Sequence, residues 1–123
     1  MFFKTNRPSN GIGSLIGAGT RIEGDVFFGG GLRLDGSVHG KVCVLPGQSG
    51  TLVVGQTGRI DGEVVVPNLV LNGTVNGKVA ESEMLEIQST ARVSGDVYYR
   101  FISVRQGAIV EGLLVHRDDL KVT

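Results

Sequence analysis

The stretch LVLNGTVNGKV, residues 69–79, decides the fold. Its odd positions hold Leu, Leu, Gly, Val, Gly and Val, whereas most of its even positions hold polar residues. Such strict alternation predicts a β-strand with one buried face. Glycine nevertheless occupies two of the buried positions, Gly73 and Gly77, where it would weaken an ordinary strand. The fold must therefore be one in which a buried glycine has a use.

The same motif, apolar-x-Gly-x-apolar, recurs along the chain. Its copies are IEGDV (22–26), LDGSV (34–38), VHGKV (38–42), IDGEV (60–64), LNGTV (71–75), VNGKV (75–79), VSGDV (93–97) and VEGLL (110–114). The last glycines of the groups are Gly24, Gly40, Gly62, Gly77, Gly95 and Gly112, with spacings of 16, 22, 15, 18 and 17 residues. The longest spacing contains LPGQSG (45–50), which is typical of a loop insertion. The chain is therefore predicted to contain six copies of one short unit.

A unit of this length cannot bury its own apolar face, so it must stack on its copies as solenoid repeats do. Alternation within each unit favours strands, and we expect an all-β, single-domain β-helix of about six coils. The glycines would then be corner residues, either small and inward or with positive φ. Ordinary hairpins fit less well, because their turn glycines are flanked by polar residues and not by valines.

The alternation also assigns residues to the inside and the outside of the coils. Unit two would bury Leu32, Leu34, Val38, Val42 and Val44, and unit five Leu85, Ile87, Ala91, Val93, Val97 and Tyr99. Arg33, Asp35, His39, Lys41 and Cys43 would face out. The residues after the corner glycines, Asp25, Lys41, Glu63, Lys78, Asp96 and Leu113, alternate in charge until the last one. Stacked about 4.8 Å apart, opposite charges in this column would act as register markers.

Composition excludes several classes of function. Twelve basic and twelve acidic residues give zero formal net charge, so nucleic acid is not an expected partner. The single Cys43 cannot form an internal disulfide, which fits a reducing compartment. We find neither a secretory leader nor an apolar run of the roughly 20 residues that span a membrane, and we expect a cytoplasmic protein.

Catalytic chemistry has no candidate residues here: we predict no catalytic, cofactor-binding or metal-binding site, and no enzyme activity. His39 and His116 lie in different units, and both are expected at the solvated surface. One alternative is an acyltransferase of the left-handed hexapeptide-repeat class, because Ile16, Ile22 and Phe28 are spaced by six residues. Units two and four break that spacing. A second alternative is a monomeric solenoid that binds a partner along its side.

The ends of the solenoid are the expected functional surfaces. We place the β-helix at residues 12–116, between tails at 1–11 and 117–123, and find no capping helix on either side. Open strand edges are templates for pairing with another chain. The predicted interface residues are Phe101, Ile102, Val104, Val110 and Leu114 at the C-terminal end, and Ile16, Ile22 and Val26 at the N-terminal end. The chain should therefore polymerise with copies of itself.

With its repeated units, six-coil length, short uncapped tails and an initial Met-Phe followed by Lys4, the chain resembles the bactofilins from about Ile12 to His116. These are bacterial proteins that assemble into filaments without nucleotide. The resemblance implies a right-handed, triangular β-helix and head-to-head, tail-to-tail stacking into non-polar filaments, with a residue such as Phe101 in a C-terminal contact. It also implies cytoskeletal scaffolding, a role in cell shape and recruitment of envelope-synthesis proteins. Longer members have Pro-rich tails that this chain lacks.

The N-terminal tail is a candidate membrane anchor. Met1, Phe2 and Phe3 are apolar, and Lys4, Arg7 and the terminal amine are cationic, a combination that binds anionic lipid weakly. A filament presents many copies of such a weak anchor, which multiplies its effect. The resemblance points the same way and places the filament at the inner face of the cell membrane. Alternatively, residues 1–3 pack on the first coil.

Overall fold

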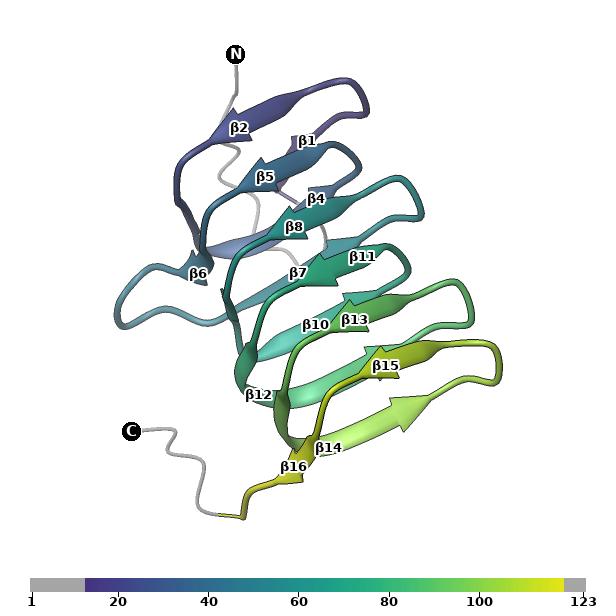
Figure 1. Cartoon of the computed structure of the whole chain (residues 1–123). Helices are drawn as coiled ribbons and strands as arrows, with labels where there is room; N and C mark the ends of the chain where they lie inside the picture. Colours follow the sequence, from purple (N-terminus) through teal and green to yellow (C-terminus); the bar gives the residue numbers. More distant parts are fainter. Residues whose placement is uncertain (1–12, 119–123) are drawn as a thin grey trace.

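The computed structural model describes residues 13–118, and the predictions for residues 1–12 and 119–123 lie outside this range. Within it, all sixteen regular elements are β-strands, and every strand pair is parallel. The strands wind into a solenoid of stacked coils (Figure 1). No described segment is a helix of the length and apolarity that crossing a membrane requires.

Each coil contributes one strand segment to each of three faces, named here A, B and C. Face A contains β1 (Ser14–Ile16), β4 (Gly30–Leu34), β7 (Gly50–Val54), β10 (Asn68–Leu71) and the second parts of β12 (Val79–Ile87) and β14 (Val97–Val104). Face B contains β2 (Arg21–Glu23), β5 (Ser37–His39), β8 (Arg59–Asp61), β11 (Thr74–Asn76), β13 (Arg92–Ser94) and β15 (Ile109–Glu111). Face C contains β3 (Val26–Phe28), β6 (Val42–Val44), β9 (Val64–Val65), the first parts of β12 and β14, and β16 (Leu114–His116).

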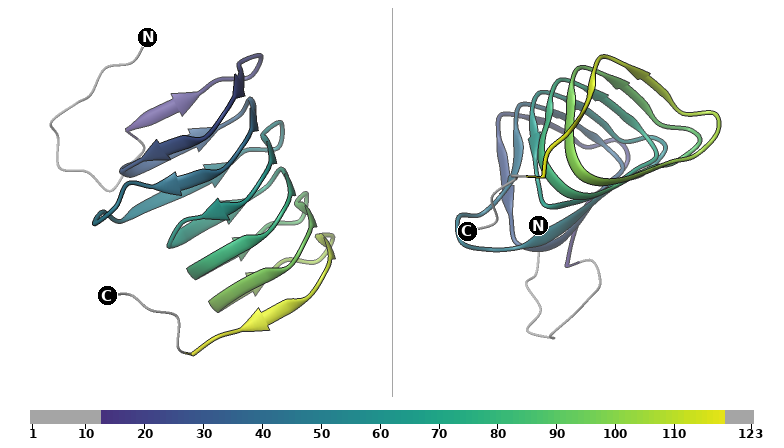
Figure 2. Two further views of the ribbon diagram at one scale, coloured as in Figure 1. Left: turned by 60° about the vertical axis from the view of Figure 1, so that its left-hand side comes forward. Right: turned by 90° about the horizontal axis from the view of Figure 1, so that it is seen from below.

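The six strands of face B count six coils, as predicted. Seen from the C-terminal end, the coils have a triangular outline, and the chain runs counterclockwise as it approaches the viewer (Figure 2, right). The solenoid is therefore right-handed. This hand agrees with the expectation and removes the left-handed hexapeptide-repeat fold as an alternative.

The core is a set of inward columns that run the length of the solenoid. On face B, for example, Ile22, Val38, Ile60, Val75, Val93 and Val110 stand in register. Columns of this kind bury the inward residues of the middle coils almost completely. The inward assignments of units two and five are confirmed, with Val44 and Tyr99 only partly buried against the core. Apolar stacking between identical positions therefore replaces the single large core of a globular domain.

The two glycines of residues 69–79 lie at different corners of the coil but are required for the same steric reason. Gly77 has φ 155° and belongs to the column of corner glycines between faces B and C. A Cβ on Gly77 would lie under 3.0 Å from the carbonyl oxygen of Gly62, which belongs to the preceding coil. Gly73 lies at the corner between faces A and B, where a Cβ would collide in the same way with the carbonyl oxygen of Gly58. Both positions need glycine because the backbone of the preceding coil lies too close for a side chain.

The long spacing in the second unit is a loop, as the sequence indicates. Residues 45–49 connect β6 to β7, with a turn in which Gln48 N donates to Leu45 O at 3.0 Å. The loop projects from the side of the solenoid beyond β6 (Figure 1). The insertion therefore leaves the stacking register unbroken, and Gly30 to Leu34 still pair with Gly50 to Val54.

Cys43 faces outward, as predicted, and is nevertheless buried. It lies on the outer side of β6, as the alternation requires, but only 8% of its surface is exposed. The outer neighbours in register are Phe27 and Val65, which are apolar and stand directly beside it. Burial raises the pKa of the Cys43 thiol, with Asp25 and Glu63 adding to that rise and Lys41 opposing it. Facing outward therefore leaves only a small part of this side chain accessible.

Candidate functional site: the open ends of the solenoid

The last coil has one hydrogen-bonded edge and one open edge. The second part of β14, β15 and β16 each pair with the preceding coil, and no described residue pairs with their other edge. Such an edge presents a row of backbone N–H and C=O groups without strand partners. The first coil has the same property, because β1, β2 and β3 pair only with β4, β5 and β6. Within residues 13–118, therefore, both ends are strand templates.

The C-terminal end is apolar as well as open. Val104 and Leu114 point inward but remain 48% and 46% exposed, whereas their partners one coil earlier, Ile87 and Val97, are 1% and 0% exposed. The predicted residues Ile102 and Val110 are partly buried against the core beside them. Full burial of a valine or leucine contributes about 1.5–3 kcal/mol, so covering two half-exposed side chains would contribute roughly 1.5–3 kcal/mol. A further coil stacked on this end would cover these side chains.

Phe101 lies at the edge of this end and not inside the inward columns. It faces outward on face A, 56% exposed, in register with the exposed Met84 of β12. The guanidinium carbon of Arg100 lies 5.4 Å from the centre of the Phe101 ring. The outward residues Ile109 and Leu113 add two more exposed apolar groups to the same rim. Phe101 is therefore positioned to flank an end contact.

The N-terminal end is built from the same columns, and its rim carries an ion pair as well as the exposed apolar residues Leu15 and Phe27. The predicted residues Ile16, Ile22 and Val26 are partly buried and head inward columns that continue into fully buried residues below. On the rim, Arg21 and Glu23 form an ion pair on face B. The corner glycine Gly24 has φ 133°, yet a Cβ built on it meets nothing within 4 Å, because no described coil lies on that side. The space that a preceding rung would occupy is open here.

The column of charges after the corner glycines is in register, but its contacts differ from the expectation. Asp25 Oδ1 accepts a hydrogen bond of 2.9 Å from the backbone N of Lys41, and Asp96 Oδ1 accepts one of 3.0 Å from Leu113 N. Lys78 Nζ instead lies 5.2 Å from the centre of the Tyr98 ring. Among the described residues no ion pair joins members of this column. The two aspartates thus bond backbone donors at the corner.

The histidines occur in surface contacts. His39 Nε2 lies 3.4 Å from Asp61 Oδ2 on face B. Asp61 also accepts hydrogen bonds from Asn76 Nδ2 at 2.8 Å and Arg59 Nε at 3.2 Å, and these two donors hold its pKa below the usual range. The His116 ring lies against the Tyr99 ring, with centres 5.6 Å apart and planes tilted by 55°. No group of three or more potential metal-binding side chains occurs within residues 13–118.

A side surface was missed by the sequence reasoning. The outward positions of face C are apolar in every coil, so the third segment of most units, such as VFF (26–28) and VVV (64–66), is apolar in both phases. Loss of alternation in that segment was the available indication, and Cys43 is part of it.

Taken together, right-handed parallel coils and two open, apolar-edged ends define a class of protein: a β-solenoid whose ends are suited to pairing with further strands. The family model described as "Bactofilin: Polymer-forming cytoskeletal" matches residues 14–115. The chain belongs to the bactofilin family.

Two curated relatives, both from Myxococcus xanthus (strain DK1622), are similar to the chain. Bactofilin BacO is 26% identical over 99 residues, which cover 80% of this chain and 75% of BacO. Bactofilin BacP is 27% identical over 104 residues, which cover 85% of this chain and 42% of BacP. No solved structure matched the chain. The match to residues 14–115 spans all six coils, so the family describes the whole solenoid.

Proposed function

We propose that this chain polymerises end to end, without nucleotide, into non-polar filaments that serve as a membrane-associated scaffold. Membership of a family described as polymer-forming and cytoskeletal supports polymerisation. The observation that supports end-to-end stacking is the contrast between Val104 and Ile87, which stand in register but are 48% and 1% exposed. At the C-terminal end, Val104 and Leu114 are half exposed, and a second copy would supply the missing neighbour of each.

Nucleotide independence follows from where the free energy of assembly would come from. Strand edges and inward apolar side chains are present in the folded subunit, and both are satisfied directly by another rung. No bound ligand is required to create the contact. Assembly is then controlled by subunit concentration alone, as in any mass-action equilibrium.

The non-polar arrangement follows from the difference between the ends. The C-terminal rim carries Phe101, Ile109 and Leu113, whereas the N-terminal rim carries the Arg21–Glu23 pair beside the exposed Leu15 and Phe27. The apolar rim is covered best by another apolar rim, because a charged pair brought against it would lose water without gaining a partner. We therefore propose C-terminal ends against C-terminal ends, and N-terminal ends against each other.

Membrane association is assigned to Met1, Phe2, Phe3, Lys4 and Arg7, all outside the described residues. One such tail binds anionic lipid weakly, and a filament that presents many tails binds through multivalency. The scaffold would lie on the cytoplasmic face of the cell membrane, where envelope-synthesis proteins are the proposed partners.

The test combines electron microscopy with vesicle sedimentation. Purified protein in EDTA without nucleotide should form filaments and sediment with vesicles that contain phosphatidylglycerol. Deletion of residues 1–7 should abolish sedimentation and spare the filaments. Absence of filaments would reject polymerisation by the chain alone. Unchanged sedimentation after the deletion would reject the proposed anchor.

A further inference from the structure

The outer side of face C carries an apolar column that runs the length of the solenoid. We call it the face C stripe; it consists of Phe27, Cys43, Val65, Ala80, Tyr98 and Val115. Strand register places Phe27 beside Cys43, Cys43 beside Val65, Val65 beside Ala80, and Tyr98 beside Val115. Ala80 and Tyr98 follow the paired residues Val79 and Val97, and the register between β12 and β14 shifts just after that pair. All six coils thus contribute one apolar residue.

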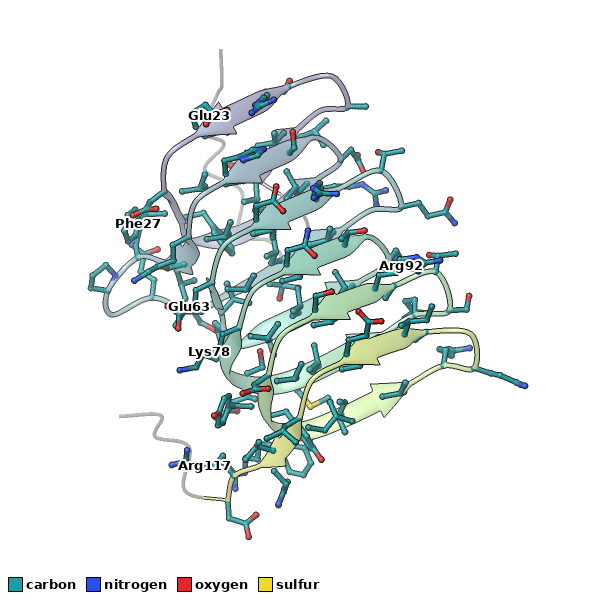
Figure 3. All side chains as sticks on the ribbon, viewed as in Figure 1. Glu23, Phe27, Glu63, Lys78, Arg92 and Arg117 are labelled. Atoms are coloured by element: carbon teal, nitrogen blue, oxygen red, sulfur yellow. The ribbon has the colours of Figure 1, made fainter. Side chains whose placement is uncertain are left out.

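This pattern is specific to face C. The outer column of face B that begins at Arg21 also contains Arg59 and Arg92, and the neighbouring column contains Glu23, Asp61 and Glu111. On face C the most exposed member of the stripe is Phe27, at 54%. Phe27 projects from the same side of the solenoid as Glu63 and Lys78, which belong to the charged column beside the stripe (Figure 3). An exposed aromatic ring thus stands at the N-terminal head of an apolar track.

The dimensions of the stripe favour a peptide segment over a second subunit. Five intervals between adjacent strands make it about 24 Å long, and it is one residue wide. Its area is therefore on the order of 200 Å², well below the roughly 800 Å² per partner of a stable interface between proteins. A tethered segment can bind to so small a surface, because its effective concentration reaches about millimolar values.

The start of the described chain lies close to the head of the stripe. Gly13 N donates to Gly31 O at 3.1 Å, which places the start of the solenoid path at the corner between faces C and A. Phe27 precedes Gly31 by only four residues, so it lies within about 14 Å of that point. Residues 1–12 span up to about 40 Å when extended, enough to follow the whole stripe.

We propose that residues 1–12 of the same chain dock along the face C stripe, with Phe2 and Phe3 against Phe27 and its neighbours. Two aromatic rings of this segment match the apolar column, and Lys4 and Arg7 can pair with the carboxylates of Asp25 and Glu63, which alternate with Lys41 and Lys78 in the neighbouring column. Docking also has a consequence that rests on the proposed function. A docked segment hides Phe2 and Phe3 from lipid, so an anionic membrane and the stripe compete for it.

Cys43 is a native reporter of this docking, because it is the chain's only cysteine and lies within the stripe. We expect the double substitution Phe2→Ser/Phe3→Ser to raise the rate of Cys43 alkylation by a small maleimide about tenfold, the factor that corresponds to about 1.4 kcal/mol. The matched control Thr5→Ser/Ser9→Ala, in the same segment, should leave the rate within about twofold of the wild type. The same ratios of alkylation rates should be found in the Phe101→Arg background, in which we expect no long filaments, if filament packing is not what protects Cys43.

An equal rate in the wild type and the double variant overturns the proposal. Protection that grows with protein concentration in the Phe101→Arg background also overturns it, because the occupant would then be a second copy. A second measurement does not depend on rates. Under mild oxidation, the Phe3→Cys variant should form an intrachain disulfide with Cys43. The control chain carries Phe3→Cys, Cys43→Ser and Ser94→Cys, which moves the second cysteine to face B, and it should form little disulfide. Equal yields in the two chains would overturn docking.

Vesicles separate this inference from membrane attachment. If both hold, phosphatidylglycerol vesicles should raise the alkylation rate of wild-type Cys43 toward that of the double variant, because lipid removes the segment from the stripe. Protection that persists with vesicles, together with no sedimentation, supports docking and rejects the membrane anchor.

Discussion

Two alanine substitutions in the corner-glycine column separate folding from assembly. Gly24 and Gly77 both have positive φ, at 133° and 155°, and both sit at the corner between faces B and C. A Cβ on Gly77 would lie under 3.0 Å from Gly62 O, whereas a Cβ on Gly24 meets nothing within 4 Å. In the later coils, a Cβ on the corner glycine would point at the preceding coil. The Cβ of Gly24→Ala, in the first coil, would therefore protrude from the N-terminal end, where we place a second subunit.

The expected magnitudes differ accordingly. A non-glycine residue in such a backbone conformation costs on the order of 1–3 kcal/mol, which applies to both substitutions. Gly77→Ala adds an overpacking cost of about 1–3 kcal/mol, because its neighbour is backbone and cannot rotate away. The free energy of unfolding should therefore fall by roughly 2–6 kcal/mol in Gly77→Ala and by about 1–3 kcal/mol in Gly24→Ala, against a typical total of about 5–15 kcal/mol.

The assay is urea unfolding followed by circular dichroism, with Phe101→Arg as the background so that assembly does not contribute to stability. Filament formation by Gly24→Ala alone is then scored by electron microscopy. We expect Gly24→Ala to be the more stable of the two by about 1–3 kcal/mol and to form few or only short filaments. Equal destabilisation would refute the steric reason for the glycine column. Normal filaments of Gly24→Ala would refute rung-on-rung stacking at the N-terminal end.

Further predictions concern the C-terminal rim, the tail and face B. Phe101→Arg should convert filaments into short soluble species, because it places an unpaired charge at an apolar rim, whereas Ser94→Arg on the outer side of face B should assemble normally; long filaments of Phe101→Arg would show that the rim is not in the contact. In the Phe101→Arg background, the chain lacking residues 1–7 should lose no more than about 1.4 kcal/mol of its free energy of unfolding, the stabilisation that corresponds to tenfold protection by the docked segment; a larger loss would place that segment inside the folding unit. Asn76 and Arg59 lower the pKa of Asp61, so their bonds stabilise the fold fully above about pH 4, the ordinary carboxyl range, and lose that contribution as pH falls through the lowered pKa. The stability difference between the wild type and Asp61→Asn should thus be constant from about pH 5 to 7 and shrink as the pH falls below about 4; a pH-independent difference would contradict it.

The solenoid could be predicted from the sequence because a short repeat places similar residues at equivalent positions of every coil. Alternation fixed the inward side of Leu34, Val38 and Val42, all of which are fully buried, and the spacing of the glycines fixed the number of coils. Gly77 shows why the pattern is legible: a backbone carbonyl one coil away permits no side chain there. Because the same steric requirement acts in each of these coils, glycine recurs at regular intervals in the sequence.

The surfaces were harder to predict, because they depend on neighbours that are distant in the sequence. Cys43 is buried by residues 16 positions before it and 22 after it, Phe27 and Val65, which become adjacent only once the register is known. The charged column was identified correctly by spacing, yet Asp25 and Asp96 bond backbone N–H groups and Lys78 lies over an aromatic ring. Flexible side chains choose among partners at the corner, and spacing does not specify that choice.

Electron microscopy of the purified chain, in EDTA and without nucleotide at about 0.15 M salt, tests the central claim most directly. Six coils at about 4.8 Å each give about 29 Å of filament per subunit, and head-to-head pairing doubles the axial repeat to about 58 Å. We predict unbranched filaments with that repeat and with identical appearance in both directions. Single particles at every protein concentration would contradict the account, as would filaments with a clear polarity and a repeat of one subunit.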